Sequence, residues 1–308
     1  MIGKSALLLT ALLLAPTTAA RAQSDKGESN HAVGADVFYS NDADDTEVLR
    51  VGANLDFVRR GPENYLGLRL EKAWFNPIGR GWTGRERIYL RAAGDVGGGW
   101  KMAANVGTDG DTVLGAASIH DEARFRKEFF LEREILETPQ GLDRGIYYTF
   151  GGAALDLPVN DRNLFTVVAG LQEFTGDNVR THGRANYIHV LKPEIGLSAQ
   201  LRTRWFRNSD PREYDYYSPR WYAQLLPVLQ MRRTTDSGWR YLIAGGIGAQ
   251  RDSESDWRRS SYFNAQATSP QVVKGWAVTG AFLFSETPTT SGQSYNYSQF
   301  SAGLVRAF

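Results

Sequence analysis

The stretch Ser-Tyr-Asn-Tyr-Ser-Gln-Phe-Ser-Ala-Gly-Leu-Val-Arg-Ala-Phe occupies positions 294–308 and ends the chain. Its residues alternate along the backbone, and one face is made by Phe300, Ala302, Leu304 and Phe308. Successive side chains of a β-strand point to opposite faces, so this alternation predicts a strand with one apolar face. The other face carries small and polar residues together with a valine.

An alternating strand that stops on an aromatic residue resembles the insertion signal of bacterial outer-membrane β-barrels. On that resemblance, Phe308 is expected to be the signal that the barrel assembly machinery reads. Arg306 departs from the signal, which more often has an apolar or aromatic residue at that position. The resemblance implies that the chain enters a membrane through strands.

The N-terminal segment has the features of a secretory signal peptide. Lys4 precedes the apolar run 6–15, and Ala20-Arg21-Ala22 supplies small residues for cleavage before Gln23. The run is shorter than the roughly 18 apolar residues of a spanning helix, and no later segment reaches that length without a charge. We therefore expect a signal peptide over 1–22, a short polar lead over 23–30 and one domain over 31–308.

The composition narrows the class of protein further. The chain has no cysteine, which excludes disulfides and thiolate metal sites. Its 35 basic and 34 acidic residues nearly cancel, which argues against a nucleic-acid partner. It also contains 32 glycines, 8 tryptophans, 14 tyrosines and 15 phenylalanines, although its mean hydropathy is −0.38. Many aromatic rings without long apolar runs are typical of strands that face lipid on one side.

Alternation recurs in segments of the length expected of tilted membrane strands. We predict sixteen strands, at 32–40, 46–58, 64–74, 84–96, 98–107, 111–120, 123–136, 145–157, 163–174, 179–191, 194–207, 220–233, 238–251, 258–269, 272–286 and 294–308. The predicted fold is therefore all-β, a 16-stranded antiparallel transmembrane β-barrel of the outer membrane of a Gram-negative bacterium. The alternative is a secreted β-sandwich, whose strands are usually shorter.

Three of these segments show clearly different faces. Leu201 and Trp205 alternate with Arg202 and Arg204, so the first pair suits lipid and the second suits water. Phe165, Val167 and Leu171 form another apolar stripe, and Trp276, Val278 and Phe282 form a third. The segment 124–136 has charges on both faces and is expected to contain a bulge.

The lengths of the connections predict the orientation of the barrel. With both termini in the periplasm, odd-numbered connections should lie outside the cell and be the longer ones. Most of the long connections are odd, and the longest is 208–219. It is the only candidate for a loop that constricts the pore.

A barrel of this size is wide enough for an aqueous lumen, so its inward side chains decide what passes. The inferred inward set is rich in arginine, carboxylate and tyrosine, and its substrate-path candidates are Arg69, Glu71, Arg87, Tyr89, Arg91, Arg126, Glu128, Arg180, Arg184, Arg202, Arg204, Tyr222 and Arg232. Arginine can bind carboxylates in pairs or lie against a sugar ring. For any one of these residues, the alternative is a structural ladder of arginine and carboxylate along the wall.

No serine lies in a nucleophile motif, and the candidates for a catalytic base are His120, His182 and His189. A polar lumen position is the alternative for His182, which lies between Arg180 and Arg184 in the alternation. We therefore expect no enzymatic activity, no cofactor and no metal.

The segment 216–232 reads Tyr-Tyr-Ser-Pro-Arg-Trp-Tyr-Ala-Gln-Leu-Leu-Pro-Val-Leu-Gln-Met-Arg. It resembles a segment near the end of the barrel of the cellulose synthase outer-membrane subunit, and the poly-N-acetylglucosamine export porin looks like a relative of the same type. The matching positions are Tyr217, Ser218, Pro219, Tyr222, Pro227 and Arg232. A proline inside a barrel strand removes a ladder hydrogen bond, so a bulge is expected at Pro227.

The resemblance implies a passive outer-membrane conduit for an exopolysaccharide, cellulose-like or related. Those subunits carry a long periplasmic tetratricopeptide array, which this sequence does not show. The expected partners are therefore outer-membrane lipid, the polysaccharide chain, a separate periplasmic tetratricopeptide scaffold, an inner-membrane glycosyltransferase and the barrel assembly machinery. Near-balanced charge in the lumen favours a neutral or zwitterionic glycan.

Two other functions remain open from the sequence. One is a general or small-solute porin, which requires a constriction loop. The other is a plugged barrel that acts as a surface receptor or in assembly.

Overall fold

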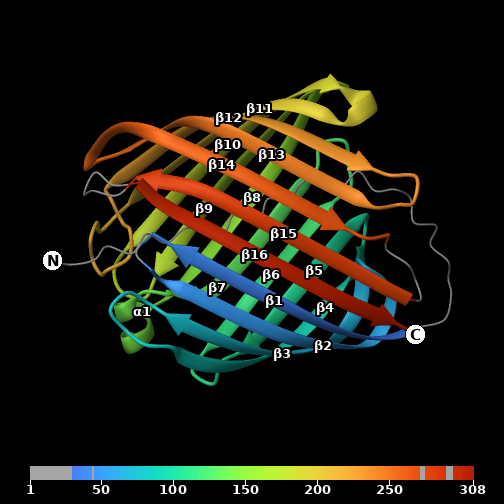
Figure 1. Cartoon of the computed structure of the whole chain (residues 1–308), viewed down its shortest axis with the longest axis horizontal. Helices are drawn as coiled ribbons and strands as arrows, with labels where there is room; N and C mark the ends of the chain where they lie inside the picture. The colour runs from blue at the N-terminus through green and yellow to red at the C-terminus, as the bar shows by residue number, and fades with distance from the viewer. Residues whose placement is uncertain (1–29, 44, 271–274, 289–293) are drawn as a thin grey trace.

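The computed structural model describes residues 30–43, 45–270, 275–288 and 294–308. They form a closed antiparallel barrel in which every strand pairs with its neighbours in sequence and β1 pairs with β16 (Figure 1). The strands are β1 Asn30–Asp42, β2 Glu47–Gly61, β3 Asn64–Asn76, β4 Thr83–Gly97, β5 Trp100–Thr108, β6 Val113–Asp121, β7 Lys127–Ile135, β8 Tyr147–Asn160, β9 Asn163–Phe174, β10 Val179–Lys192, β11 Leu197–Asn208, β12 Trp221–Thr234, β13 Arg240–Asp252, β14 Ser255–Thr268, β15 Gly275–Pro288 and β16 Ser294–Ala307. The sixteen predicted strands are confirmed. The predicted signal peptide lies outside the described residues.

The first and last strands pair along most of their length. Their register runs from Ala32 opposite Ala307 to Asp42 opposite Tyr297. At the end of this seam, the amide of Phe308 donates to His31 O at 3.0 Å, and the amide of His31 donates to Phe308 O at 3.2 Å. The seam therefore leaves no sheet edge in need of a partner.

The strand boundaries differ from the prediction mainly at the start of β7. Residues 122–126 form a turn there, and the Asp121 carboxylate accepts the Lys127 amide at 2.8 Å. The bulge expected in 124–136 is wrong, because β7 keeps one register with β6 and with β8. The irregularities in pairing lie near strand ends, for example between Asp56 and Val58.

The bulge expected at Pro227 is also wrong. Leu225 pairs with Ala249 and Val228 pairs with Gly246, so the register between β12 and β13 is the same on both sides of the proline. Pro227 keeps its place opposite Leu201 on the other side. Since proline has no amide hydrogen, the strand loses pairing toward β13 there without gaining a residue.

Large apolar side chains cover the outside of the barrel. Leu201 and Trp205 are exposed, whereas Arg202 and Arg204 on the same strand are not. The stripes predicted on β9 and β15 are exposed as well, including Leu171 (58 % exposed). Soluble monomers rarely expose so much contiguous apolar surface. No helix among the described residues is long and apolar enough to cross a membrane.

The two ends of the barrel differ. A short helix, α1 (Pro139–Arg144), lies at the end where the odd-numbered connections gather, and the C-terminus lies at the opposite end (Figure 1). The two longest connections among the described residues, 136–146 and 209–220, are both odd-numbered. We call the end that carries α1 the mouth. The even-numbered connections are mostly short turns at the opposite end of the barrel, where the C-terminus lies.

Close approach between β4 and β5 gives a test of the packing. A Cβ atom on Gly107 would lie 1.9 Å from Ile88 O and 2.6 Å from Tyr89 Cα, whereas one on Gly280 would meet nothing within 4 Å. We expect Gly107→Ala to lower the free energy of unfolding by about 1–3 kcal/mol, because the backbone must shift. The matched change Gly280→Ala should stay within about 0.5 kcal/mol of the unchanged protein. Urea unfolding of the refolded barrel measures both, and equal midpoints would contradict the close approach.

Candidate functional site

The barrel encloses a cavity of about 1210 Å³. All strands except β4 contribute to its lining, from Phe38 on β1 to Gln299 on β16. A second cavity of about 380 Å³ lies on the side of β1–β4, where it is lined by Asp36, Arg69 and Arg91 among others. Arg50 and Tyr65 line both cavities, so the two adjoin.

The structure brings the sequence-derived candidates into the interior but divides them between the two cavities. The larger cavity is lined by Arg126, Glu128, Arg184, Arg202, Arg204, Tyr222 and Arg232. The smaller cavity is lined by Arg69, Glu71, Tyr89 and Arg91. Arg87 and Arg180 are buried and line neither cavity. Contact of any of these residues with a substrate stays a prediction.

On one side of the lumen, the arginines are paired with carboxylates. Arg69 donates from Nη2 to Asp36 at 2.8 Å and to Glu71 at 2.7 Å. Arg87 continues the chain, with Nη1 3.1 Å from Glu71 and Nη2 2.8 Å from Glu134. Breaking a buried ion pair leaves an uncompensated charge at a high energetic cost. These residues therefore form the structural ladder that the sequence left open as an alternative.

The ladder continues into the mouth through Arg50. Its guanidinium lies 3.4 Å from Glu134 and 2.5 Å from Glu137, which follows β7. Burial raises the pKa of the Glu137 carboxyl, and the charge of Arg50 opposes that shift. The ion pair between Arg50 on β2 and Glu137 attaches the connection 136–146 to the wall.

On the opposite side, β10 and β11 carry arginines without carboxylate partners. No acidic group of the described chain lies within ion-pair distance of Arg180, Arg184, Arg202 or Arg204. Arg180 is fully buried, donates to Asn208 at 2.8 Å and to Tyr217 O at 2.5 Å, and lies over the rings of Phe174 and Phe206. It therefore holds the mouth in place, whereas the other three face the larger cavity.

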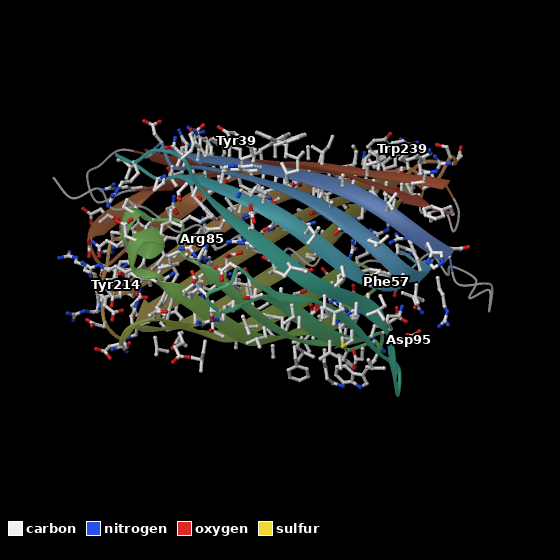
Figure 2. All side chains as sticks on the ribbon, turned by 90° about the horizontal axis from the view of Figure 1, so that it is seen from below. Tyr39, Phe57, Arg85, Asp95, Tyr214 and Trp239 are labelled. Carbon is white, nitrogen blue, oxygen red and sulfur yellow. The ribbon has the colours of Figure 1, made fainter. Side chains whose placement is uncertain are left out.

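The connection 136–146 folds into the mouth because its sequence starts a helix and then stops it. The Thr138 hydroxyl accepts the Gly141 amide at 3.0 Å, Pro139 opens the helix, and Gly145 ends it at φ 65°. Thr138-Pro139 is a local helix-start signal in the sequence, although no helix was predicted there. Figure 2 shows α1 within the outline of the barrel, at the end marked by Arg85 and Tyr214.

Apolar side chains bind this connection to the inner wall. Leu136 and Ile146 are buried against Phe150 and Phe174, in one cluster with Tyr216. A second cluster joins Ile135 and Leu142 of the same region to a set of wall residues, namely Val48, Ala73, Phe75, Tyr89, Leu114 and Tyr147. The connection therefore packs as part of the core.

The connection 209–220 is hydrogen-bonded to the connection 136–146. Asp215 accepts the Thr138 hydroxyl at 2.6 Å and the Gln140 amide at 2.8 Å. The ring of Tyr216 stacks on Phe174 with centroids 4.4 Å apart. We call the two connections together the mouth plug. The expectation that 208–219 was the only candidate for a constriction loop is wrong, because 136–146 also folds inward.

The residues of the family-like segment occupy three places. Tyr217, Ser218 and Pro219 form the base of the mouth plug, where the Ser218 hydroxyl accepts the Arg212 amide at 2.9 Å. The Tyr217 hydroxyl donates to Asp252, and burial with this bond raises the pKa of the phenol. Tyr222 donates to Gln250 at 2.6 Å in the wall. Pro227 is on the exposed face of β12, and Arg232 lines the cavity farther along that strand.

His182, weighed as a catalytic base, lies inside the wall near the mouth. Its Nε2 is 2.9 Å from Gln172 Oε1, and its ring contacts those of Phe150 and Phe206. The described residues contain no group of three or more side chains placed to hold a metal ion.

No protein-family model matches this sequence, and no curated protein matches it. Among solved structures, the barrel is similar to one described as a bacterial polysaccharide outer membrane secretin, with a TM-score of 0.66 and 11% identity over 90% of this chain and 98% of that one. Weaker similarities include Pseudomonas aeruginosa OprD (TM-score 0.46, 8% identity, 91% and 96% covered) and Acinetobacter baumannii OccAB3 (0.44, 10%, 91% and 100%). At these identities, the first similarity shows the shared barrel fold.

The bonds of Asp215 give a test of the mouth plug. Asp215→Ala removes the acceptor for Thr138 and Gln140, which should cost about 1–3 kcal/mol of local stability. We expect trypsin to cleave after Arg144 about tenfold faster, because cleavage follows local opening. Asp210→Ala in the same connection is the control, since the Asp210 side chain is exposed. Equal cleavage of both variants would show that Asp215 does not hold the plug.

Proposed function

We propose that this chain is an outer-membrane pore through which an exopolysaccharide leaves the cell. A closed barrel pairs backbone groups from strand to strand around the whole wall, as a membrane requires, and its outer face carries the apolar side chains that suit lipid. With both termini in the periplasm, the end of the barrel that carries the C-terminus lies in the periplasm and the mouth faces out of the cell. The barrel assembly machinery would insert the chain, with Phe308 as its signal.

The observation that carries this proposal is the lining of the larger cavity. Amide side chains point into it from several strands, among them Gln200, Gln224, Asn264 and Gln266, together with the ring of Tyr262. Amides can hydrogen-bond sugar hydroxyls, and rings can stack on sugar faces. Many weak contacts allow a polymer to move, whereas one tight site would stop it.

Two further observations support a polysaccharide over other cargo. The structure that the barrel resembles at a TM-score of 0.66 is described as a polysaccharide secretin. Four of the six positions that resemble the exporters lie at the junction of wall and mouth plug, where a polymer would leave, namely Tyr217, Ser218, Pro219 and Tyr222. A glycosyltransferase in the inner membrane would supply the driving force, and a separate periplasmic tetratricopeptide protein would guide the chain to the pore.

A small-solute porin is the second candidate. The inward fold of 136–146 favours a porin. Such a connection narrows the pore and still leaves a permanently open path for small molecules. A polymer conduit instead needs the mouth plug to leave the inner wall, which requires its buried apolar contacts and the Arg50–Glu137 ion pair to open.

Channel recording separates the two candidates. We expect the purified barrel to show little steady conductance in a planar bilayer, because the mouth plug packs against the inner wall and narrows the mouth. Replacing 137–145 by a short glycine linker should produce a large steady conductance. The matched control shortens 235–239, a turn at the other end of the barrel whose side-chain hydrogen bonds stay within the turn. A large conductance of the unchanged barrel would favour the porin, and no pore in either form would contradict both.

Secretion tests the cargo directly. Deleting the gene should abolish release of an extracellular polysaccharide while its synthesis continues, so polymer should collect in the periplasm. Expression of the unchanged chain should restore release. Normal secretion by the deletion strain would contradict the conduit.

A further inference from the structure

Two arginines face each other across neighbouring strands in the wall of the larger cavity. Arg184 on β10 is the direct register partner of Arg204 on β11, and Arg202 lies one step along the same face, opposite Asn186. All three line the cavity. Like charges directly opposite each other destabilise a sheet, so the arrangement carries a cost that packing alone does not explain.

The guanidinium groups of this arginine cluster (Arg184, Arg202 and Arg204) lack anionic partners. Within the described residues, Arg184 makes no hydrogen bond, and its Nε and Nη2 are buried with no acceptor, as is Nε of Arg204. The carboxyl of Glu132 acts on Arg184 only beyond ion-pair distance, and it accepts the Tyr148 hydroxyl at 2.7 Å. Buried donors without acceptors are rare and call for an explanation.

Aromatic rings lie over the guanidinium groups of two members of the cluster, Arg202 and Arg204. Arg204 lies over Phe206 and Tyr222, with distances of 5.6 and 5.8 Å to the ring centroids. Arg202 lies 4.9 Å from the centroid of Tyr262, and its Nε donates to Gln200 at 2.9 Å. Stacking stabilises the cations without using most of their N–H groups. The edges of the guanidinium groups are therefore available for a planar oxyanion, which arginine binds with two parallel hydrogen bonds.

The charges of the whole cavity lining also favour an anion at the arginine cluster. Seven arginines and six carboxylates line the cavity, so the near balance expected from the sequence is present. The balance is not local, however. Glu128, Glu134 and Glu137 are already paired with arginines, and Asp156 accepts the Thr166 hydroxyl. The face of β10 and β11 therefore presents positive charge that the rest of the lining does not neutralise.

We propose that Arg184, Arg202 and Arg204 form a binding subsite for the carboxylate of an acidic sugar unit on the transported glycan. This inference rests on the proposed conduit and replaces the neutral cargo that the overall charge balance favours. A carboxylate between Arg184 and Arg204 accepts their free N–H groups and screens their repulsion. The neighbouring ring of Tyr262 and the amides of Gln200 and Asn186 lie where the sugar ring follows.

Calorimetry on the refolded full barrel tests the subsite. The probes are tetragalacturonate, which carries carboxylates, and cellotetraose, which is neutral and of equal length. We expect tetragalacturonate to bind about tenfold or more tightly than cellotetraose, and Arg184→Gln or Arg204→Gln to weaken it by about tenfold each. Arg184→Lys keeps the charge without the planar fork and should bind between the two. Sodium acetate at equal carboxylate concentration should compete poorly, since it lacks the sugar.

Arg133→Gln is the matched control. Arg133 lines the smaller cavity and donates to the Thr149 hydroxyl at 2.7 Å, so its loss removes one lumen charge outside the arginine cluster. It should leave tetragalacturonate binding unchanged. The melting temperature gives a second readout, because relief of repulsion should keep Arg184→Gln at least as stable as the unchanged barrel while binding falls.

Equal binding of the two tetrasaccharides, unchanged binding in the cluster variants, or equal competition by acetate would each overturn the subsite. These outcomes are distinguishable from failure of the conduit. If secretion depends on the gene but the acidic probe does not bind, the conduit stands and the subsite falls. If the probe binds through the arginine cluster but secretion is normal without the gene, the subsite stands as an acidic-sugar site of a different kind of pore.

Discussion

Closure of the backbone hydrogen-bond ladder is the constraint on which the rest of this structure depends. β1 must meet β16 in register, which Ala32 opposite Ala307 and Asp42 opposite Tyr297 satisfy. Once the ladder closes, each strand has one face that points inward and one that points outward, with no freedom to exchange them. Charged groups on the inward face are then confined together, and their pairing becomes a matter of register between strands.

That confinement explains why the lumen has two different sides. On the side of β1–β4, Asp36 and Glu71 lie among the arginines together with Glu134, which comes from β7, and the charges neutralise one another. On β10 and β11, register places Arg184 against Arg204, and aromatic rings are the neighbours. The first side stabilises the barrel and anchors the mouth plug. On the second side, guanidinium N–H groups of Arg184 and Arg204 lack acceptors within the described residues.

The strands and their faces were predictable from the sequence, because a period of two is a local property. Phe165, Leu201 and Trp276 fall on the outside as their alternation indicates. The pairing of arginines was not predictable, since it depends on the register between strands and on contacts between strands that are not neighbours, such as β4 and β7. The plug was missed for a similar reason, because Leu142 packs with wall residues such as Phe75, which are distant in sequence. Thr138-Pro139 was the local sequence sign of α1. The bulges expected at Pro227 and in 124–136 are absent, so a proline or charges on both faces of a strand do not by themselves predict where the register shifts.

The seam between His31 and Phe308 also has a consequence for how the barrel forms. It joins the two ends of the described chain, so its loop-closure entropy is the largest of any strand pair and its contacts are the last that synthesis makes available. Until the seam forms, β1 and β16 are open edges that any other extended chain can join. The same two strands that complete the wall are therefore its weak point during assembly, and protection of unfinished edges is part of what this sequence requires of the cell.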